Sequence, residues 1–181
     1  MEIERDQLTA ILEQRRQAGA GIVAVDAPTF KVVIFAIGES CFAFPGRQII
    51  EILPLTTIHA VPGCPSFLEG VINVRGDIDS VIRLGDLLDA QHAPVERQAA
   101  ILLGHSRSTV PPMRSGLRID RVLDVLDVIE SSIQPPPETL PEALRGLASG
   151  VFRQREQTVI LLDLERLFQD IQRRAGQRHA A

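Results

Sequence analysis

The sequence has no tryptophan and no tyrosine, and Lys31 is the only lysine among its 181 residues. Aromatic side chains are the platforms on which proteins stack nucleic-acid bases, and clustered basic residues neutralise phosphates. Because these residues are scarce and the formal net charge is -4, the composition argues against a nucleic-acid partner. A phosphate-binding G-K-[ST] loop is excluded as well, since Phe30 precedes the lysine.

Cysteine is scarce too, and no C-x-x-C motif occurs. Cys41 and Cys64 are interpreted as small apolar residues, one within a strand and one in a turn. The four histidines stand far apart in sequence, at His59, His92, His105 and His179. No local pair therefore starts a metal site, and we expect no metal and no cofactor.

Long apolar runs are also missing. Runs such as Val159–Leu162 are far shorter than the roughly 20 apolar residues that cross a bilayer. The N-terminus alternates charged with isolated apolar residues, which is not the pattern of a secretory signal. We therefore expect a cytoplasmic protein without direct membrane insertion.

What the chain does contain is a series of short β-rich segments separated by turn residues. A short helix is predicted over Asp6–Gln17, and an amphipathic helix is predicted after Asp163 as its N-cap. A polar loop is expected over Gly104–Ser115, and the proline-rich Gln134–Pro141 excludes a strand ladder there. The predicted strands are Phe30–Ile37, Cys41–Phe44, Gln48–Leu53, Gly70–Val74, Ile78–Leu84, Gln98–Leu103, Gly116–Asp120, Arg121–Ile129, Gly150–Arg153 and Thr158–Leu162.

Two parts of this pattern repeat. Gly70–Leu88 superposes on Gly150–Phe168 without a gap, and the apolar positions agree while the polar ones diverge. Burial constrains inward side chains and leaves outward ones free, so this is how two copies of one packing unit should look. A weaker echo relates Ile49, Glu51 and Ile52 to Val122, Asp124 and Val125. Chance similarity of β-rich segments is the alternative.

The repeat predicts an all-β fold of two small five-stranded barrels that bury apolar surface against each other. Residues 1–29 are assigned to an N-terminal extension, residues 30–175 to the double-barrel domain and residues 176–181 to a flexible tail. The second barrel is expected mainly from residues 98–162. The groove between the barrels is then the natural place for a partner.

Motifs for catalysis are missing, since neither G-x-S-x-G nor H-E-x-x-H occurs. Asp77 and Asp79 could form a carboxylate pair beside a turn, although solvating a hairpin is the simpler role. Arg75 enters a tight turn in which Gly76 permits a positive φ. Its planar guanidinium can bridge several acceptors and still face a partner, but spacing alone also fits an ordinary exposed turn arginine.

Several segments together resemble the CheW family, the coupling proteins of bacterial chemotaxis arrays. Phe42–Leu53 (FAFPGRQIIEIL) resembles the family's "YAIPV" and "V-x-E-I" segments, and Gly70–Gly76 (GVINVRG) resembles its "G-V-I-N-L-R-G". Gly116–Val122 and Leu161–Leu164 are similar to two later segments. The resemblance extends from about Phe30 to Ile171, and GVINVRG is its most specific part.

This resemblance implies two SH3-like five-stranded barrels and a non-enzymatic adaptor. The implied partners are the regulatory domain of a chemotaxis-type histidine kinase and the cytoplasmic tip of a methyl-accepting chemoreceptor, at membrane-associated arrays. The implied partner-binding residues are Ile49, Glu51, Gly70, Asn73, Arg75, Gly76, Ala99 and Gly116. Two positions depart from the pattern, because Ser80 replaces a proline and Arg83 replaces an aspartate.

Other functions stay open at this point. One is a small-molecule sensor that holds its ligand between the barrels. Another is a CheW-like inhibitor that occupies the kinase or the receptor without passing the signal, which the charge reversal at Arg83 permits. An enzyme that uses Asp77 and Asp79 is a third. The sequence does not choose among flagellar, pilus-type and other chemosensory pathways.

Overall fold

The computed structural model describes residues 27–90 and 98–177, in which strands are the main secondary structure. The all-β prediction is confirmed in this coarse form, whereas the helix predicted over Asp6–Gln17 lies outside the described residues. The strands are β1 (Thr29–Ile37), β2 (Ser40–Pro45), β3 (Ile49–Pro54), β4 (Leu68–Val74), β5 (Asp77–Arg83), β6 (Ala100–Ser106), β7 (Met113–Ile119), β8 (Arg121–Ile129), β9 (Ala148–Gln154) and β10 (Gln157–Leu162). The helices are η1 (Gly46–Gln48), α2 (Leu84–Leu88), η2 (Glu130–Ser132), α3 (Glu142–Leu147) and α4 (Leu164–Gln177).

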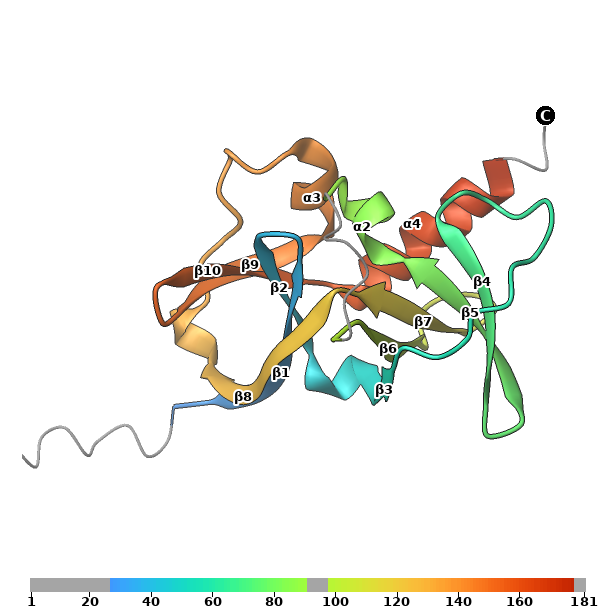
Figure 1. Ribbon diagram of the computed structural model, residues 1–181. Coiled ribbons are helices and arrows are strands. Elements are labelled where there is room, and N and C mark those ends of the chain that lie inside the picture. The colour runs from blue at the N-terminus through green and yellow to red at the C-terminus, as the bar shows by residue number, and fades with distance from the viewer. Residues whose placement is uncertain (1–26, 91–97, 178–181) are drawn as a thin grey trace, which may run out of the picture.

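The strands form two five-stranded sheets (Figure 1). The first sheet has the order β8-β1-β2-β10-β9 and the second has the order β3-β6-β7-β5-β4. This division differs from the predicted one, in which residues 98–162 mainly form the second unit. β6 and β7 do lie in the second sheet, but β8, β9 and β10 complete the first. The parallel pairs β2–β10 and β5–β7 join strands far apart in the chain, and no local turn pattern specifies such a pairing.

No strand ladder closes either sheet into a barrel within the described residues. Instead, one isolated bridge links the segment that follows β3 to β4, through His59 and Val71. The equivalent bridge links the segment that follows β8 to β9, through Gln134 and Val151. The two units are thus five-stranded, as predicted, but the closed barrels are not confirmed, because the outer edges of each sheet meet through one isolated bridge within the described residues.

The repeat is confirmed by the positions of the elements. The offset that aligns Gly70 with Gly150 also aligns the first residues of β4, β5 and α2 with those of β9, β10 and α4, respectively. The pairing register repeats as well, since Gly70 and Gly150 each lie opposite the residue eleven positions later. Arg75 and Arg155, which begin the two hairpin turns, both have a φ of 55°. The two copies therefore share backbone conformation as well as apolar positions.

The weaker echo between β3 and β8 is also structural. β3 has an extra, unpaired residue at Ile50, and β8 has one at Leu123, which is where the echo aligns them. Such bulges bend an edge strand and redirect its side chains. Both bulged strands leave apolar side chains exposed, namely Ile50 and Ile52 on β3 and Leu123 and Val125 on β8.

The main core lies between the two sheets and is shared by both of them and by α2, α3 and α4. Along β1, Val33, Phe35 and Ile37 face this core, whereas Val32 and Ile34 face a smaller core on the other side of the first sheet. This alternation follows from the two-residue period of a strand. A third cluster, which includes Ile72, Val81 and Ile101, packs on the face of the second sheet that points away from the main core.

The loop predicted over Gly104–Ser115 is shorter than expected, because β6 runs on to Ser106 and β7 begins at Met113. The proline-rich Gln134–Pro141 carries no ladder, as predicted, and α3 follows it. Asp163 caps α4 as predicted, since its Oδ1 accepts a hydrogen bond from the Glu165 amide at 2.9 Å. Within the two described ranges, no helix combines the length and apolar character that a bilayer crossing requires.

Candidate functional site

An ion pair joins the edge strand β3 to the turn between β4 and β5. Nη1 of Arg75 lies 3.0 Å from Oε2 of Glu51, and Nη2 lies 2.6 Å from Oε1. The two parallel contacts form the bidentate geometry that a guanidinium makes with a carboxylate. The arginine side chain is 77% exposed and the glutamate side chain 27%. The pair therefore fixes the orientation of Arg75 while most of its surface faces solvent.

The turn that carries this arginine is held by its own sequence. Oδ1 of Asn73 accepts a hydrogen bond from the Gly76 amide at 2.8 Å. Arg75 and Gly76 both have positive φ, at 55° and 99°, as the tight hairpin turns that match strand twist require. This conformation strains an arginine, so the Asn-x-Arg-Gly motif holds an exposed cation at a cost in backbone energy.

Apolar side chains accompany the ion pair on β3. Ile50 and Ile52 are 51% and 39% exposed, and they flank Glu51 in sequence. We call Ile50, Glu51, Ile52 and Arg75 the β3 edge surface. Its two isoleucines are among the few large apolar side chains that the described residues expose. Ile52 pairs with Leu102, which faces the main core, whereas Glu51 pairs with Leu103, which faces the third cluster. Ile52 therefore lies on the opposite face of β3 from the ion pair, and the edge strand exposes aliphatic and charged groups on different faces.

The predicted partner-binding residues fall into two groups. The structure brings Glu51, Asn73, Arg75 and Gly76 together at the β3 edge surface and its turn. Gly70, Ala99 and Gly116 are buried, and Ile49 is half-buried and packs on the main core. A Cβ on Gly116 would lie 2.6 Å from Cγ2 of Ile101, and one on Gly70 would lie 2.2 Å from the His59 carbonyl oxygen. The buried members therefore shape the second sheet rather than present a surface.

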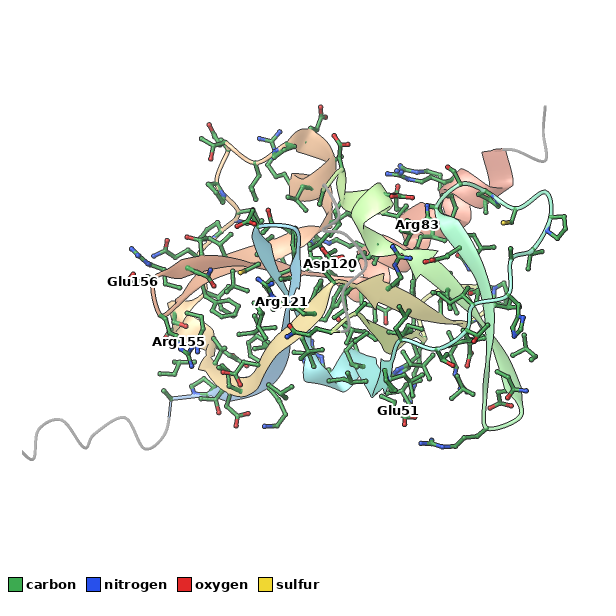
Figure 2. The ribbon with its side chains drawn as sticks, viewed as in Figure 1. Glu51, Arg83, Asp120, Arg121, Arg155 and Glu156 are labelled. Atoms are coloured by element: carbon green, nitrogen blue, oxygen red, sulfur yellow. The ribbon has the colours of Figure 1, made fainter. Side chains whose placement is uncertain are left out.

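The two departures from the family pattern have local partners. Oγ of Ser80 lies 2.8 Å from Oγ of Ser115, which is buried in the neighbouring strand β7. Nη1 of Arg83 lies 3.5 Å from Oδ2 of Asp86, and its Nε lies 3.9 Å from Oε2 of Glu69. The positive charge at Arg83 is thus balanced within the chain, and it lies well away from Glu51 (Figure 2).

The candidate carboxylate pair is engaged by one arginine. Nη2 of Arg114 lies 2.9 Å from Oδ2 of the buried Asp79, and Nη1 lies 3.3 Å from Oδ2 of the exposed Asp77. This arrangement ties β7 to β5, which is a structural role. In the described part of the chain, no three His, Cys, Asp or Glu side chains gather as metal ligands would.

Among the residues that the structure describes, Cys41 and Glu165 have displaced pKa values. Burial raises the pKa of the Cys41 thiol, and the charge of Arg121 opposes this effect. Burial alone would raise the pKa of Glu165, but hydrogen bonds from the Ser106 and Ser108 hydroxyls and from backbone amides outweigh it and lower the pKa. Glu165 thereby fastens the β6–β7 connection to α4, a contact between distant segments that sequence reasoning missed.

Comparisons with known proteins agree with this fold. The sequence model of the CheW-like domain family matches residues 31–172. Chemotaxis protein CheW of Treponema pallidum is 28% identical over 146 residues, which cover 81% of this chain and 86% of that protein. A probable chemotaxis protein CheW of Rhizobium etli is 30% identical over 146 residues, which cover 81% of this chain and 92% of that protein. The crystal structure of the scaffolding protein TtCheW from Thermoanaerobacter tengcongensis is similar with a TM-score of 0.69 at 25% identity, covering 80% of this chain and 91% of that one.

Proposed function

The chain belongs to the family of CheW-like domains, and from this premise we propose that it is a non-enzymatic adaptor that couples chemoreceptors to a chemotaxis-type histidine kinase. Its work is to hold two partners in a chemosensory complex at the membrane-associated receptor array. We further propose that each five-stranded sheet, with its bridging segment, is an SH3-like unit of this adaptor. The family match over residues 31–172 supports the role, and the relatives' names place such proteins in chemotaxis.

The observation that carries the proposal is the exposed Arg75 of the β3 edge surface. An ion pair in which one side chain is 77% exposed adds little to stability. The positive φ of Arg75 is shared by Arg155 in the other copy, so the distinguishing feature of Arg75 is its bidentate pairing with Glu51. Arginine is one of the residue types enriched among those that dominate binding energy. We assign this surface to the receptor tip, with Glu51 as the group that orients the guanidinium.

The repeat supplies a matched control for the test. Arg155 occupies the equivalent turn of the other copy with the same φ of 55°, but on the first sheet. Replacing either arginine by alanine therefore makes the same change in charge, length and turn strain. Only Arg75→Ala removes the guanidinium of the β3 edge surface.

The experiment is a pull-down of the purified chain against the histidine kinases and chemoreceptors of the same organism. Arg75→Ala should weaken receptor binding by about tenfold while circular dichroism shows a folded chain, and Arg155→Ala should bind the receptor like the parent. Equal receptor binding by all three proteins would contradict the assignment of the surface. Failure of the parent to bind any kinase or receptor would contradict the adaptor role.

The other functions receive less support from the described residues. The inhibitor hypothesis was based on the charge reversal at Arg83. The positive charge of Arg83 is balanced by Asp86 and Glu69, so it does not present an unmatched charge to a partner. The main core packs between the sheets, so a ligand held there would have to displace apolar side chains.

A further inference from the structure

Two large apolar side chains of the edge strand β8 lie uncovered on the face of the first sheet that carries the main core. Val125 and Ile129 are 44% and 41% exposed. Val125 pairs with Val33, which faces the main core, and Ile129 pairs with Thr29. Paired residues share a face of a sheet, as do residues two apart on one strand. Both side chains therefore lie on the core side of the sheet but outside the core itself.

Charged side chains accompany them on the same face. Asp127 lies opposite Lys31 of β1, and Oδ2 of Asp127 is 3.3 Å from Nζ of Lys31. Glu130 follows Ile129 at the start of η2, is exposed, and forms no ion pair with a described residue. We call Val125, Asp127, Ile129 and Glu130 the β8 strip. The strip is apolar along its length and acidic at the end where η2 begins.

The chain enters the first sheet beside this acidic end. The carbonyl oxygen of Pro28 accepts a hydrogen bond from the Glu130 amide at 2.9 Å, and Thr29 lies opposite Ile129. In Figure 1 this entry point is the blue end of β1, next to β8. Residues 1–26 precede it in the chain. They are therefore joined to the sheet at the end of the β8 strip.

The sequence of this N-terminal extension contains a segment that matches the strip. The helix predicted over Asp6–Gln17 has Leu8, Ile11 and Leu12 on one side. Arg15 is seven residues after Leu8 and falls on the same side. The apolar side of the predicted helix thus ends in a basic residue, as the apolar part of the strip ends in an acidic one.

We propose that residues 6–17 dock as a helix on the β8 strip of the same chain. The apolar side of the helix packs on Val125 and Ile129, and Arg15 lies against Glu130. The helix then runs in the direction of β8, and its last turn lies close to the start of β1. The N-terminal extension is in this way a built-in cover, which a partner of this face has to displace.

The lengths of the two parts are compatible. The apolar side of the helix is about 10 Å long from Leu8 to Arg15, and the strip extends about 13 Å from Val125 to Ile129. Residues 18–26 connect the helix to the sheet and reach about 30 Å when extended, which is more than the turn back into β1 requires. Because the tether raises the local concentration to the order of millimolar, weak contacts are enough to hold the segment.

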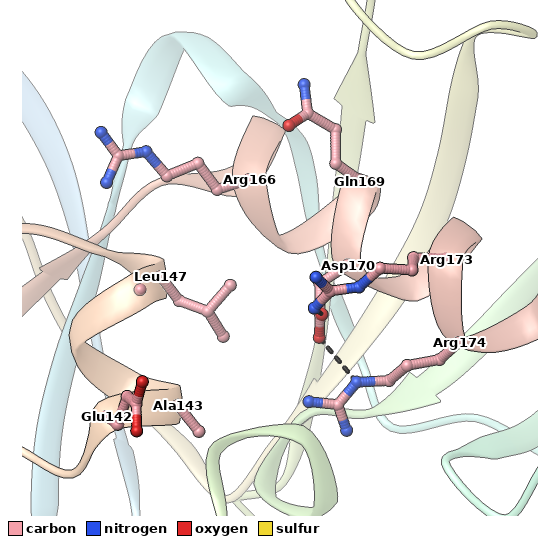
Figure 3. Close-up of a pocket in the computed structure, with 9 residues that line it drawn as sticks. Glu142, Ala143, Leu147, Arg166, Gln169, Asp170, Arg173 and Arg174 are labelled. Carbon is pink, nitrogen blue, oxygen red and sulfur yellow. Dashed lines mark hydrogen bonds and ion pairs between the residues drawn. The ribbon is translucent and has the colours of Figure 1, made fainter.

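The groove between α3 and α4 is a less suitable site for this segment (Figure 3). Its volume is about 460 Å³, but its arginines are already paired, Arg166 with Asp163 and both Arg173 and Arg174 with Asp170. The groove also lies away from the N-terminal extension, since the chain enters β1 at the lower left of Figure 1 and α3 and α4 lie towards its top.

The test is hydrogen–deuterium exchange of the full chain, with mass spectrometry of a peptide that covers residues 6–17. An isolated helix of about 12 residues is marginal in water, so its amides are protected only when it is docked. The parent should protect them, and Ile129→Lys should raise their exchange rate about tenfold. Leu123→Lys is the matched control and should leave the rate unchanged, because Leu123 is 39% exposed on the same strand but lies at the bulge, outside the strip.

A second pair of variants changes the segment instead of the strip. Leu8→Glu should raise the exchange rate as Ile129→Lys does, whereas Ala10→Glu, on the other side of the predicted helix, should not. Circular dichroism should show that all four variants keep the fold, since the two replaced β8 side chains are exposed.

Three outcomes would overturn the proposal. The first is exchange of residues 6–17 in the parent at the rate of an unstructured chain. The second is an equal rate in Ile129→Lys and Leu123→Lys. The third is protection that falls when the parent is diluted tenfold, because the occupant of the strip is then a second copy of the chain. The proposal does not rest on the receptor assignment, and Arg75→Ala should leave the protection unchanged.

Discussion

The replacement of Gly70 by alanine tests why the segment Gly70–Gly76 begins with a buried glycine. A Cβ at this position would lie 2.2 Å from the carbonyl oxygen of His59 and 2.7 Å from its carbonyl carbon. These are backbone atoms, so no side-chain rotation relieves the clash. His59 belongs to the segment that follows β3 and bridges to β4 at Val71. The alanine should therefore push this segment away from the sheet edge.

The cost can be worked from the contacts that would be lost. The bridge has two backbone hydrogen bonds of 2.9 Å between His59 and Val71, together worth about 1–3 kcal/mol. Gly70 also has a φ of 156°, and alanine in that region adds strain of about 1–3 kcal/mol. We expect Gly70→Ala to reduce the free energy of unfolding by about 2–6 kcal/mol, a large part of the stability of a typical domain.

Urea unfolding monitored by circular dichroism measures this change. Gly150→Ala, at the equivalent place in the first sheet, should cost less, because its Cβ would meet the Ile133 side chain before the Gln134 oxygen. Gly146→Ala should be neutral or stabilising, since its surroundings are open and alanine favours a helix by about 1 kcal/mol. A Gly70→Ala protein within about 0.5 kcal/mol of the parent, the ordinary scatter of surface substitutions, would refute this reasoning.

Two further predictions concern ionisable contacts. The lowered pKa of Glu165 means that its carboxylate stabilises the fold above its unfolded-state pKa and loses this effect as the pH falls through the folded-state value. Glu165→Gln should therefore destabilise the chain more at pH 7 than at about pH 3 in urea unfolding, and an equal loss at both would contradict the assignment. Asp79→Asn leaves Arg114 without its buried partner and should cost about 1–3 kcal/mol. Asp77→Asn, at an exposed carboxylate, should cost less than about 1 kcal/mol, and a reversed order would show that burial does not govern this pair.

Much of the fold was predictable because burial leaves a periodic trace in sequence. The apolar positions of the repeat identified two equivalent strand–turn–strand units, and the structure places β4 and β5 in the same register as β9 and β10. Turn residues such as Gly76 located the hairpins, since a positive φ selects glycine. The parallel pairs β2–β10 and β5–β7 could not be predicted, because they join distant strands without a turn of their own.

The sequence named candidate site residues but not their arrangement, and their role in binding stays a prediction. Glu51 and Arg75 were both named, yet their bidentate pairing across 24 positions of sequence comes from the approach of β3 to the β4–β5 turn. Gly116 was named as part of a surface and proves to be buried, because a glycine motif indicates close packing as readily as a partner.

The repeat also shows where the two copies have diverged. Arg75 and Arg155 occupy equivalent turns with the same φ, and the weaker echo aligns Glu51 with Asp124. In the first sheet, Oδ1 of Asp124 accepts a hydrogen bond from the Val125 amide at 2.8 Å, whereas Glu51 reaches across to its arginine. The aspartate is one methylene shorter, so its carboxylate bonds to the neighbouring backbone. The turn conformation that both copies share is explained by the repeated fold. The Glu51–Arg75 ion pair is specific to the second sheet, so the repeated fold does not explain it. That difference is the reason to test Arg75 against Arg155 rather than against an unrelated surface arginine.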